Sequence, residues 1–348
     1  MNAMIETSPR PDRAHPLPLA GLAVAATALL AALLLPLFVR NPALLNLAVL
    51  ALMAAQIGVA WNIVGGYAGQ VSLGHAAFFG VGAYTSSLLM LRFGLTPWIG
   101  LPAGGLLAAL LSLGFGWSCF RLRGHYFAMA TIAVAELTQI FATNWEFAGA
   151  SVGLHLPMER EGWLWLNFAA KLPYYWLALG LLVATLLATF WIERSYLGYY
   201  FRAIKDEPEA ARSVGIDIAR YKQVALAVSA FFTAVGGGLY AHKEFYIDPG
   251  SVLSTALSIK MALVAILGGI GTLSGPVLGA IVLTVIEEAS RTLFGGTGSG
   301  IDIILYAVLI VLIAVFYPAG VVGSLRGLAL RLARRLRGAR PAAEGSLP

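Results

Sequence analysis

The sequence predicts an all-α fold: a polytopic membrane helical bundle of about ten spans, with a range of eight to ten. Apolar residues make up 59% of the chain and charged residues only 11%, whereas charged residues are about 25% of an average soluble domain. The apolar residues form continuous runs of about 20, the length that crosses a hydrocarbon core as a helix. Because these runs do not alternate with polar residues, a transmembrane strand barrel is excluded.

Each predicted span is one of these apolar runs. Two are unusual, because 71–91 is polar at its start and 276–293 carries Glu287 and Glu288. A partial or re-entrant path is the alternative for both. Arg291, one helical turn beyond Glu287, indicates a local ion pair. The predicted spans cover residues 17–39, 43–61, 71–91, 97–120, 125–143, 174–193, 222–242, 255–272, 276–293 and 301–317.

The basic residues predict orientation and domain division. Just over half of the 23 Lys and Arg residues lie in the 194–222 loop and the 326–340 tail, and cytoplasmic segments are the ones enriched in these residues. We therefore expect a multi-pass inner (plasma) membrane protein with both termini in the cytoplasm. It divides into a cytoplasmic segment 1–18, a transmembrane domain 19–320 and a basic cytoplasmic tail 321–348 that contacts membrane lipid. Basic residues at span ends do not indicate nucleic acid.

No pattern in the sequence indicates catalysis. The glycine-rich stretch 268–280 lacks the spacing of a dinucleotide-binding loop, and no G-K-[ST] motif occurs in the chain. We interpret it as a tight helix-turn-helix, with Pro276 at the start of the second helix. The five histidines and the single cysteine are scattered, so we expect no catalytic residues, no metal site, no cofactor and no enzymatic activity.

A polar break at 61–75 is the first candidate functional stretch. Gly65, Gly66 and Gly69 interrupt an apolar run, and non-helical backbone at membrane depth persists only where protein or a water-filled cavity satisfies it. A helix starting near Leu73 would present free N–H groups suited to a carboxylate. The alternative is a tight polar turn between two spans. The side chains assigned to an uncharged substrate pathway here are Asn62, Gln70, Ser72 and His75.

Glu136 is a further candidate for the substrate pathway. It lies inside the predicted span 125–143, and an ionisable residue within the membrane is a functional candidate by default. The alternative is a neutral or paired carboxyl group with a structural role.

The charged loop 194–222 is the second candidate functional stretch. Pro208 can start a helix because it lacks only a donor that would be unpaired there, and Glu209 then lies in the first turn, where the helix dipole favours a negative charge. Gly215 is suited to the helix end. The sequence therefore predicts a short helix, a turn, and a lead from Asp217 into the next span. The alternative is a solvated loop without a partner.

Three stretches together resemble the permeases of ATP-binding-cassette importers for branched-chain amino acids, the LivM-type branch. The resemblance covers about residues 45–320 and includes the Glu209-Ala210-Ala211-x3-Gly215 core of the importers' coupling loop. The chain departs from the loop signature at 225–228, where Ala-Leu-Ala-Val replaces the Ile-x-Leu-Pro ending. The three stretches are GGYAGQVSLGHAAFFGVGAYTS, RAIKDEPEAARSVGIDIARYKQVALAVSAFFTAVGGGLYA and GGIGTLSGPVLGA.

The resemblance implies an importer permease fold and a set of partners. These are a second permease subunit, which the family suggests is a homologue, two cytoplasmic ATP-binding subunits and an external solute-binding protein. ATP is then bound by the partner subunits, and the substrates are leucine, isoleucine and valine. The residues that the resemblance assigns to ATPase coupling are Ala203, Glu209, Ala210, Ala211, Gly215 and Asp217.

Other transport functions remain as alternatives. Related importers carry urea, short amides or other amino acids, and an uncharged cavity would suit these nearly as well. An ion-coupled secondary transporter would explain the broken helices and Glu136, although it leaves the 194–222 loop without a role. An intramembrane enzyme lacks any catalytic constellation in this sequence.

Overall fold

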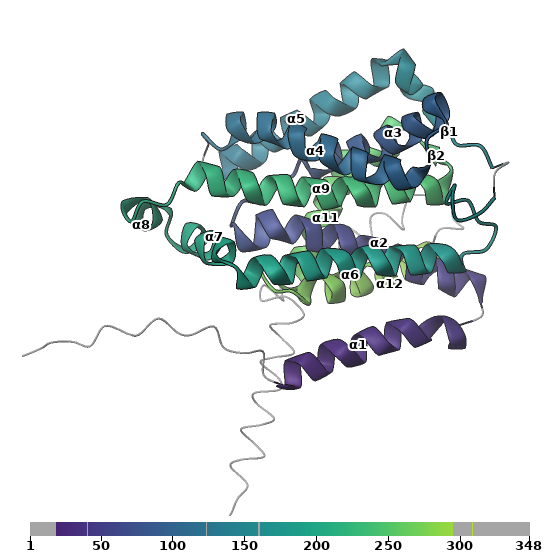
Figure 1. The fold of residues 1–348 in the computed structure, drawn as a ribbon, viewed down its shortest axis with the longest axis horizontal. Coiled ribbons are helices and arrows are strands. Elements are labelled where there is room, and N and C mark those ends of the chain that lie inside the picture. The colour runs from purple at the N-terminus through teal and green to yellow at the C-terminus, as the bar shows by residue number, and fades with distance from the viewer. Residues whose placement is uncertain (1–18, 40, 123, 159–160, 295–307, 309–348) are drawn as a thin grey trace, which may run out of the picture.

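A computed structural model describes residues 19–39, 41–122, 124–158, 161–294 and 308. The predicted segment 1–18 and tail 321–348 lie outside the described residues, as does nearly all of the predicted span 301–317. The other nine predicted spans are helical in the structure. Side by side, the long helices form one bundle, with α1 at its edge (Figure 1).

The elements follow one another as helices with two very short strands. They are α1 (Leu19–Phe38), α2 (Pro42–Asn62), η1 (Ile63–Tyr67), α3 (His75–Phe93), α4 (Pro97–Cys119), α5 (His125–Asn144), η2 (Glu146–Ala148), η3 (Ala150–Val152), β1 (Leu154–His155), α6 (Leu172–Arg194), α7 (Tyr196–Asp206), α8 (Pro208–Ser213), α9 (Ile218–Glu244), β2 (Tyr246–Ile247), α10 (Pro249–Val252), α11 (Thr255–Gly269) and α12 (Gly275–Phe294).

Seven helices in the described part of the chain are long and apolar enough to cross a membrane. They are α2 with η1, α3, α4, α5, α6, α9, and α10 with α11 taken together. α12 is long enough but carries Glu287, Glu288 and Arg291, and α1 is a further apolar helix of 20 residues. The membrane helical bundle is therefore confirmed, and seven of its predicted spans meet these criteria within the described residues.

Helix α9 lies at the centre of the bundle, against α2, α3 and α4. Its close contacts use glycine, since a Cβ at Gly237 would meet the carbonyl of Phe79, and a Cβ at Gly82 would meet the carbonyl of Ala234. Small residues allow helices in lipid to approach closely and gain packing energy. Glycine is thus required at this crossing.

Helix boundaries depart from prediction where polar side chains decide them. α9 begins at Ile218, before the predicted 222, because the Asp217 side chain accepts a hydrogen bond from the backbone N–H of Arg220. α3 begins at His75, later than the predicted 71, since Ser72 and its neighbours form other contacts.

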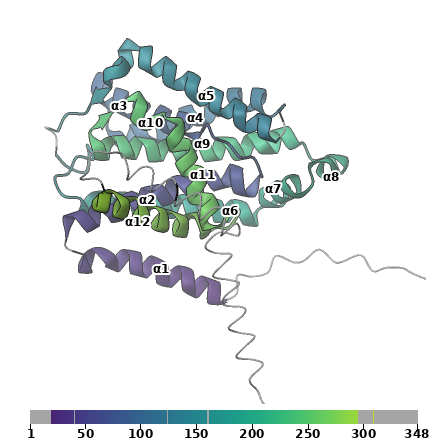
Figure 2. The ribbon, with the colours of Figure 1, turned by 180° about the vertical axis from the view of Figure 1, so that it is seen from behind.

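The two ends of the bundle differ. At one end, which we call the α8 end, α7 and α8 project beyond the long helices (Figure 1). At the other end, the sheet end, β1 pairs with β2 in antiparallel register, Leu154 opposite Ile247 and His155 opposite Tyr246. The view from behind shows α11 and α12 on the face opposite α4 and α9 (Figure 2).

Candidate functional site

Two regions concentrate unusual side chains, one at each end of the bundle. At the α8 end, α8 begins at Pro208, with Glu209 in its first turn and 3.7 Å from Arg212. Ala211 is buried and Ala210 is exposed, so the small helix is anchored on one side and open on the other. The predicted short helix is therefore confirmed.

The helix ends in this loop also follow the prediction. Gly215, with φ of +88°, comes directly after the last turn of α8, a conformation that glycine adopts without steric cost. Asp217 then caps α9. Ala203 lies earlier, half-buried in α7, a helix that was not predicted. We call residues 196–217 the coupling segment; its contact with an ATPase stays a prediction.

The coupling segment is tied to the polar break by one lysine. Lys205 of α7 donates from Nζ to the backbone carbonyl of Gly66, at 2.8 Å. In turn, Asn62 accepts from the N–H of Gly271 and donates to the carbonyl of Thr272, both at 2.9 Å. We call these five residues the glycine junction, because they join the three stretches singled out in the sequence.

Backbone shape makes this junction possible. Helix α2 ends in η1, a single π-helical turn, and such turns often occur at functional sites. A Cβ at Gly66 would collide with the Asn62 side chain and with the N–H of Gly271. The predicted helix-turn-helix at 268–280 is confirmed, with the turn between α11 and α12 held against this π-helical turn.

Ser72 and His75 are buried links between helices. The Ser229 hydroxyl donates to the carbonyl of Ala60 at 2.6 Å, so it accepts from His75 Nε2 at 2.8 Å. His75 Nδ1 shares a hydrogen bond with the Ser72 hydroxyl at 2.9 Å. Both nitrogens of the imidazole are therefore engaged by protein.

The start of α3 does not offer the predicted anion site. The N–H of Leu73 donates to Thr131, the N–H of Gly74 to Ser72, and the N–H of Ala76 to Ser258. These donors are already satisfied by side-chain hydroxyl groups, so the prediction of free N–H groups for a carboxylate was wrong. The partly exposed Gln70 donates to the carbonyl of Gly69, its own neighbour in the chain.

Glu136 does not lie in the interior of this chain. It is on an exposed face of α5, where the Thr255 hydroxyl donates to its carboxylate. Helix α5 lies at the edge of the bundle (Figure 1). The assignment of Glu136 to a substrate pathway rested on its place inside the predicted span 125–143 and stays a prediction.

The second region is a cavity of about 560 Å³ towards the sheet end. Helices α2, α9, α11 and α12 supply most of its wall, and none of the five predicted pathway residues lines it. Four basic and three acidic side chains line it instead: Lys171, Lys243, Lys260, Arg291, Glu244, Glu287 and Glu288. The cavity is therefore charged and is a different place from the predicted uncharged pathway, which stays a prediction.

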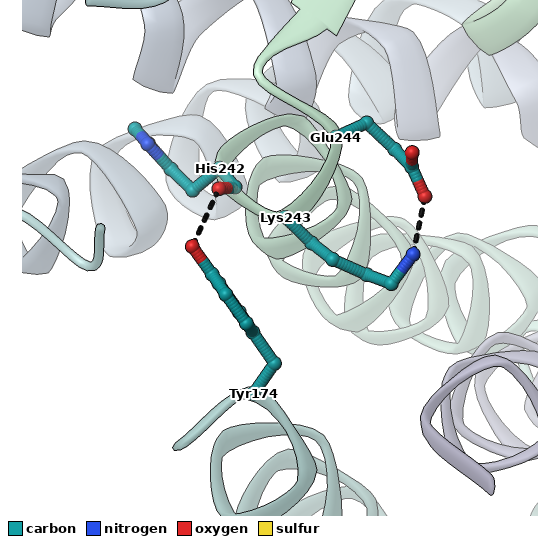
Figure 3. Close-up of polar contacts among 4 residues, drawn as sticks. All are labelled: Tyr174, His242, Lys243 and Glu244. Carbon is teal, nitrogen blue, oxygen red and sulfur yellow. Dashed lines mark hydrogen bonds and ion pairs between the residues drawn. The ribbon is translucent and has the colours of Figure 1, made fainter. Parts of the chain in front are cut away.

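Lys243 is the most enclosed of these charges, with only 4% of its side chain exposed. It pairs with Glu244, the next residue in the last turn of α9 (Figure 3). Tyr174 of α6 holds the same turn through a 3.2 Å hydrogen bond from its hydroxyl to the carbonyl of His242. A buried ammonium group is costly without such a partner, so this turn holds a cation at the cavity wall.

Lys260 and Glu287 form a second ion pair, with Nζ and Oε2 2.6 Å apart. It joins the middle of α11 to α12 and replaces the predicted local pair of Glu287 with Arg291. The sequence did contain a signal, since Lys260 and Glu287 interrupt two neighbouring apolar runs. Sequence spacing alone did not show that they meet. Among the described residues, no three His, Cys, Asp or Glu side chains cluster as metal ligands would.

Comparison with known proteins gives a consistent picture. Residues 43–314 match the family described as the permease component of branched-chain amino acid transport systems. The high-affinity branched-chain amino acid transport system permease protein LivM of Escherichia coli is 29% identical to the chain, over 83% of the chain and 72% of the relative.

More distant relatives have related descriptions. The permease protein LivH of Salmonella typhimurium is 26% identical and BraD of Pseudomonas aeruginosa is 24% identical, each over 77% of this chain and 91% of the relative. Both are described as permease proteins of high-affinity branched-chain amino acid transport systems. No solved structure gives a significant match to the chain.

Proposed function

Because the chain belongs to the family of permease components of branched-chain amino acid transport systems, we propose that it carries leucine, isoleucine and valine into the cytoplasm as a permease subunit of an ATP-binding-cassette importer. It is an integral membrane protein of the inner membrane and not itself an enzyme.

The observation that supports this function most strongly is the tie between the coupling segment and the helix break. A solvated loop would need no fixed contact with the bundle, yet Lys205 reaches the carbonyl of Gly66, 139 residues away in the chain. A hydrogen bond from a charged donor is about twice as strong as a neutral one. Movement of α8 is therefore passed to η1 rather than absorbed by a flexible loop.

The proposed assembly places the α8 end in the cytoplasm. Two ATP-binding subunits contact the coupling segment through Glu209, Ala210 and the exposed side of α8. A second permease subunit, related to this chain as LivM and LivH both are, completes the membrane part, and an external solute-binding protein docks at the sheet end. The partner subunits bind and hydrolyse ATP.

In the proposed cycle, closure of the ATP-binding subunits moves α7 and α8 together. Lys205 transmits this movement to Gly66, and Asn62 transmits it onward to the turn between α11 and α12. Since α11 and α12 also form part of the cavity wall, their displacement changes access to the cavity. The chain thus converts a cytoplasmic movement into a change at the opposite end of the bundle.

Uptake of labelled leucine by cells with and without this chain tests the proposal. We expect deletion to abolish leucine uptake. In cells with the chain, unlabelled isoleucine and valine should compete with leucine for uptake, and urea should not. Leucine uptake that persists unchanged in a strain without other leucine transporters would contradict the proposed substrate class, and competition by urea would shift it to short amides.

An ion-coupled secondary transporter is the second candidate, because the Lys260–Glu287 pair lies within the span region and such pairs mark ion pathways. A protonophore distinguishes the two functions. Uptake driven by ATP continues while ATP is maintained, whereas uptake coupled to protons stops.

A further inference from the structure

We infer that the cavity at the sheet end is the binding site for the zwitterionic head of a free amino acid, with the Lys260–Glu287 pair as its recognition element. This inference rests on the proposed function and adds to it the place and the chemistry of substrate recognition. At about 560 Å³, the cavity falls within the range of about 300–1,000 Å³ typical of small-molecule sites.

The ion pair is positioned to exchange partners with a zwitterion. The Lys260 side chain is 30% exposed and that of Glu287 44% exposed, so a solute in the cavity can reach both. A carboxylate can bind Lys260 while an ammonium group binds Glu287, and every charge stays paired. A neutral amide such as urea carries no charge. If it separated Lys260 from Glu287, both side chains would lose their charged partner, and breaking a partly buried ion pair is costly.

The deeper wall is suited to an aliphatic side chain. Met53 and Ile57 of α2 and Phe79 of α3 line the cavity and are buried. About 10 Å, seven residues of helical rise, separates Gly236 from Lys243 along α9. Lys243 is therefore nearer the sheet end than Gly236. In the proposed pose, the head of the amino acid contacts Lys260 and Glu287 and its side chain lies against Met53, Ile57 and Phe79.

One polar atom beside this wall lacks a partner. Gln56 is 1% exposed, and its Oε1 has no hydrogen-bond donor within the described part of the chain. Its Nε2 donates to the carbonyl of Phe232 at 2.9 Å, which fixes the amide. A Cβ at Gly236 would collide with Oε1, so this acceptor lies directly behind a glycine of the cavity wall. Because Gln56 does not itself line the cavity, it shapes the wall at Gly236 and is not a contact of the solute in this proposal.

Cysteine protection in the assembled importer tests the inference. In a Cys119→Ala background, Thr284→Cys places a thiol in the cavity wall and Tyr246→Cys places one outside it at the same end. We expect leucine at ten times its Kd to slow maleimide labelling of position 284 about tenfold, because occupied sites are shielded. Labelling of position 246 stays unchanged, and urea protects neither. If Thr284→Cys fails to assemble, Ser251→Cys is the second reporter.

Charge variants then test the recognition element. Replacing both Lys260 and Glu287 with methionine removes the pair without leaving an unpaired charge, and we expect leucine protection to be lost while the complex still assembles. Glu146→Gln removes a carboxylate outside the cavity and keeps protection. Retained protection in the double variant, or equal protection by urea, would overturn the inference.

The inference and the proposed function can fail separately. If the importer takes up leucine but leucine does not protect position 284, only the proposed site is refuted. If the importer takes up no branched-chain amino acid, the proposed function is refuted.

Discussion

At the scale of single residues, Lys205 joins the coupling segment to the helix break after α2. Lys205→Met keeps the length of the side chain but removes the donor to Gly66. We expect leucine uptake to fall at least about tenfold, with normal assembly, because one hydrogen bond from a charged group contributes about 1.5–3 kcal/mol.

Arg202→Met is the matched control for Lys205→Met. It removes a cation from the same helix, but Arg202 donates to the carbonyl of Gly198 in α7 and to that of Glu193 at the end of α6, and not to the glycine junction. Equal loss of uptake in both variants would show that general charge on α7, rather than the tie to the glycine junction, determines transport.

His75 and Gln70 are both predicted pathway residues, and they differ in how much they contribute to stability. His75→Ala leaves the buried Ser72 and Ser229 hydroxyls without the imidazole, and an unsatisfied buried group costs about 1–3 kcal/mol. We therefore expect His75→Ala to lower the temperature at which the detergent-solubilised importer aggregates. Gln70→Ala, with only a contact to its neighbour Gly69, should leave that temperature unchanged. An unaffected His75→Ala protein would refute the structural interpretation.

At the scale of elements, α8 is a short helix whose outer side is open to a partner. Glu209→Lys places a positive charge in its first turn, which costs the helix about 0.3–1 kcal/mol. This is too little to unfold a helix anchored by Ala211 and capped by Gly215. We expect insertion to be normal and ATP hydrolysis by the partners to become independent of substrate. Wild-type uptake by this variant would contradict the coupling role.

Sequence reasoning succeeded for elements fixed by neighbouring residues. The positions of α8 and of the turn at 268–280 were predicted because Pro208, Gly215 and Pro276 act within their own segments. It failed for contacts between distant segments. The Lys260–Glu287 pair, the tie from Lys205 and the exposed position of Glu136 all depend on how helices pack, and apolar periodicity is nearly uninformative when a helix is hydrophobic on every side.

At the scale of the whole molecule, orientation is the property to measure. In the Cys119→Ala background, Val214→Cys lies at the α8 end and Tyr246→Cys at the sheet end, and both native side chains are exposed. An impermeant maleimide added to intact cells should label only position 246. Labelling of position 214 from outside would place the coupling segment on the wrong side for cytoplasmic ATP-binding subunits.

The bond from Lys205 to Gly66 ends on a backbone oxygen. Every amino acid carries that oxygen, so a substitution of Lys205 is not accompanied by a matching side-chain substitution at position 66. Related sequences compared for correlated substitutions would leave this pair unnoticed, and a method that infers mechanical links from covariation would underestimate the connection between the two ends of the permease. Only substitution of the lysine itself, or a change in the backbone shape at 66, makes it visible.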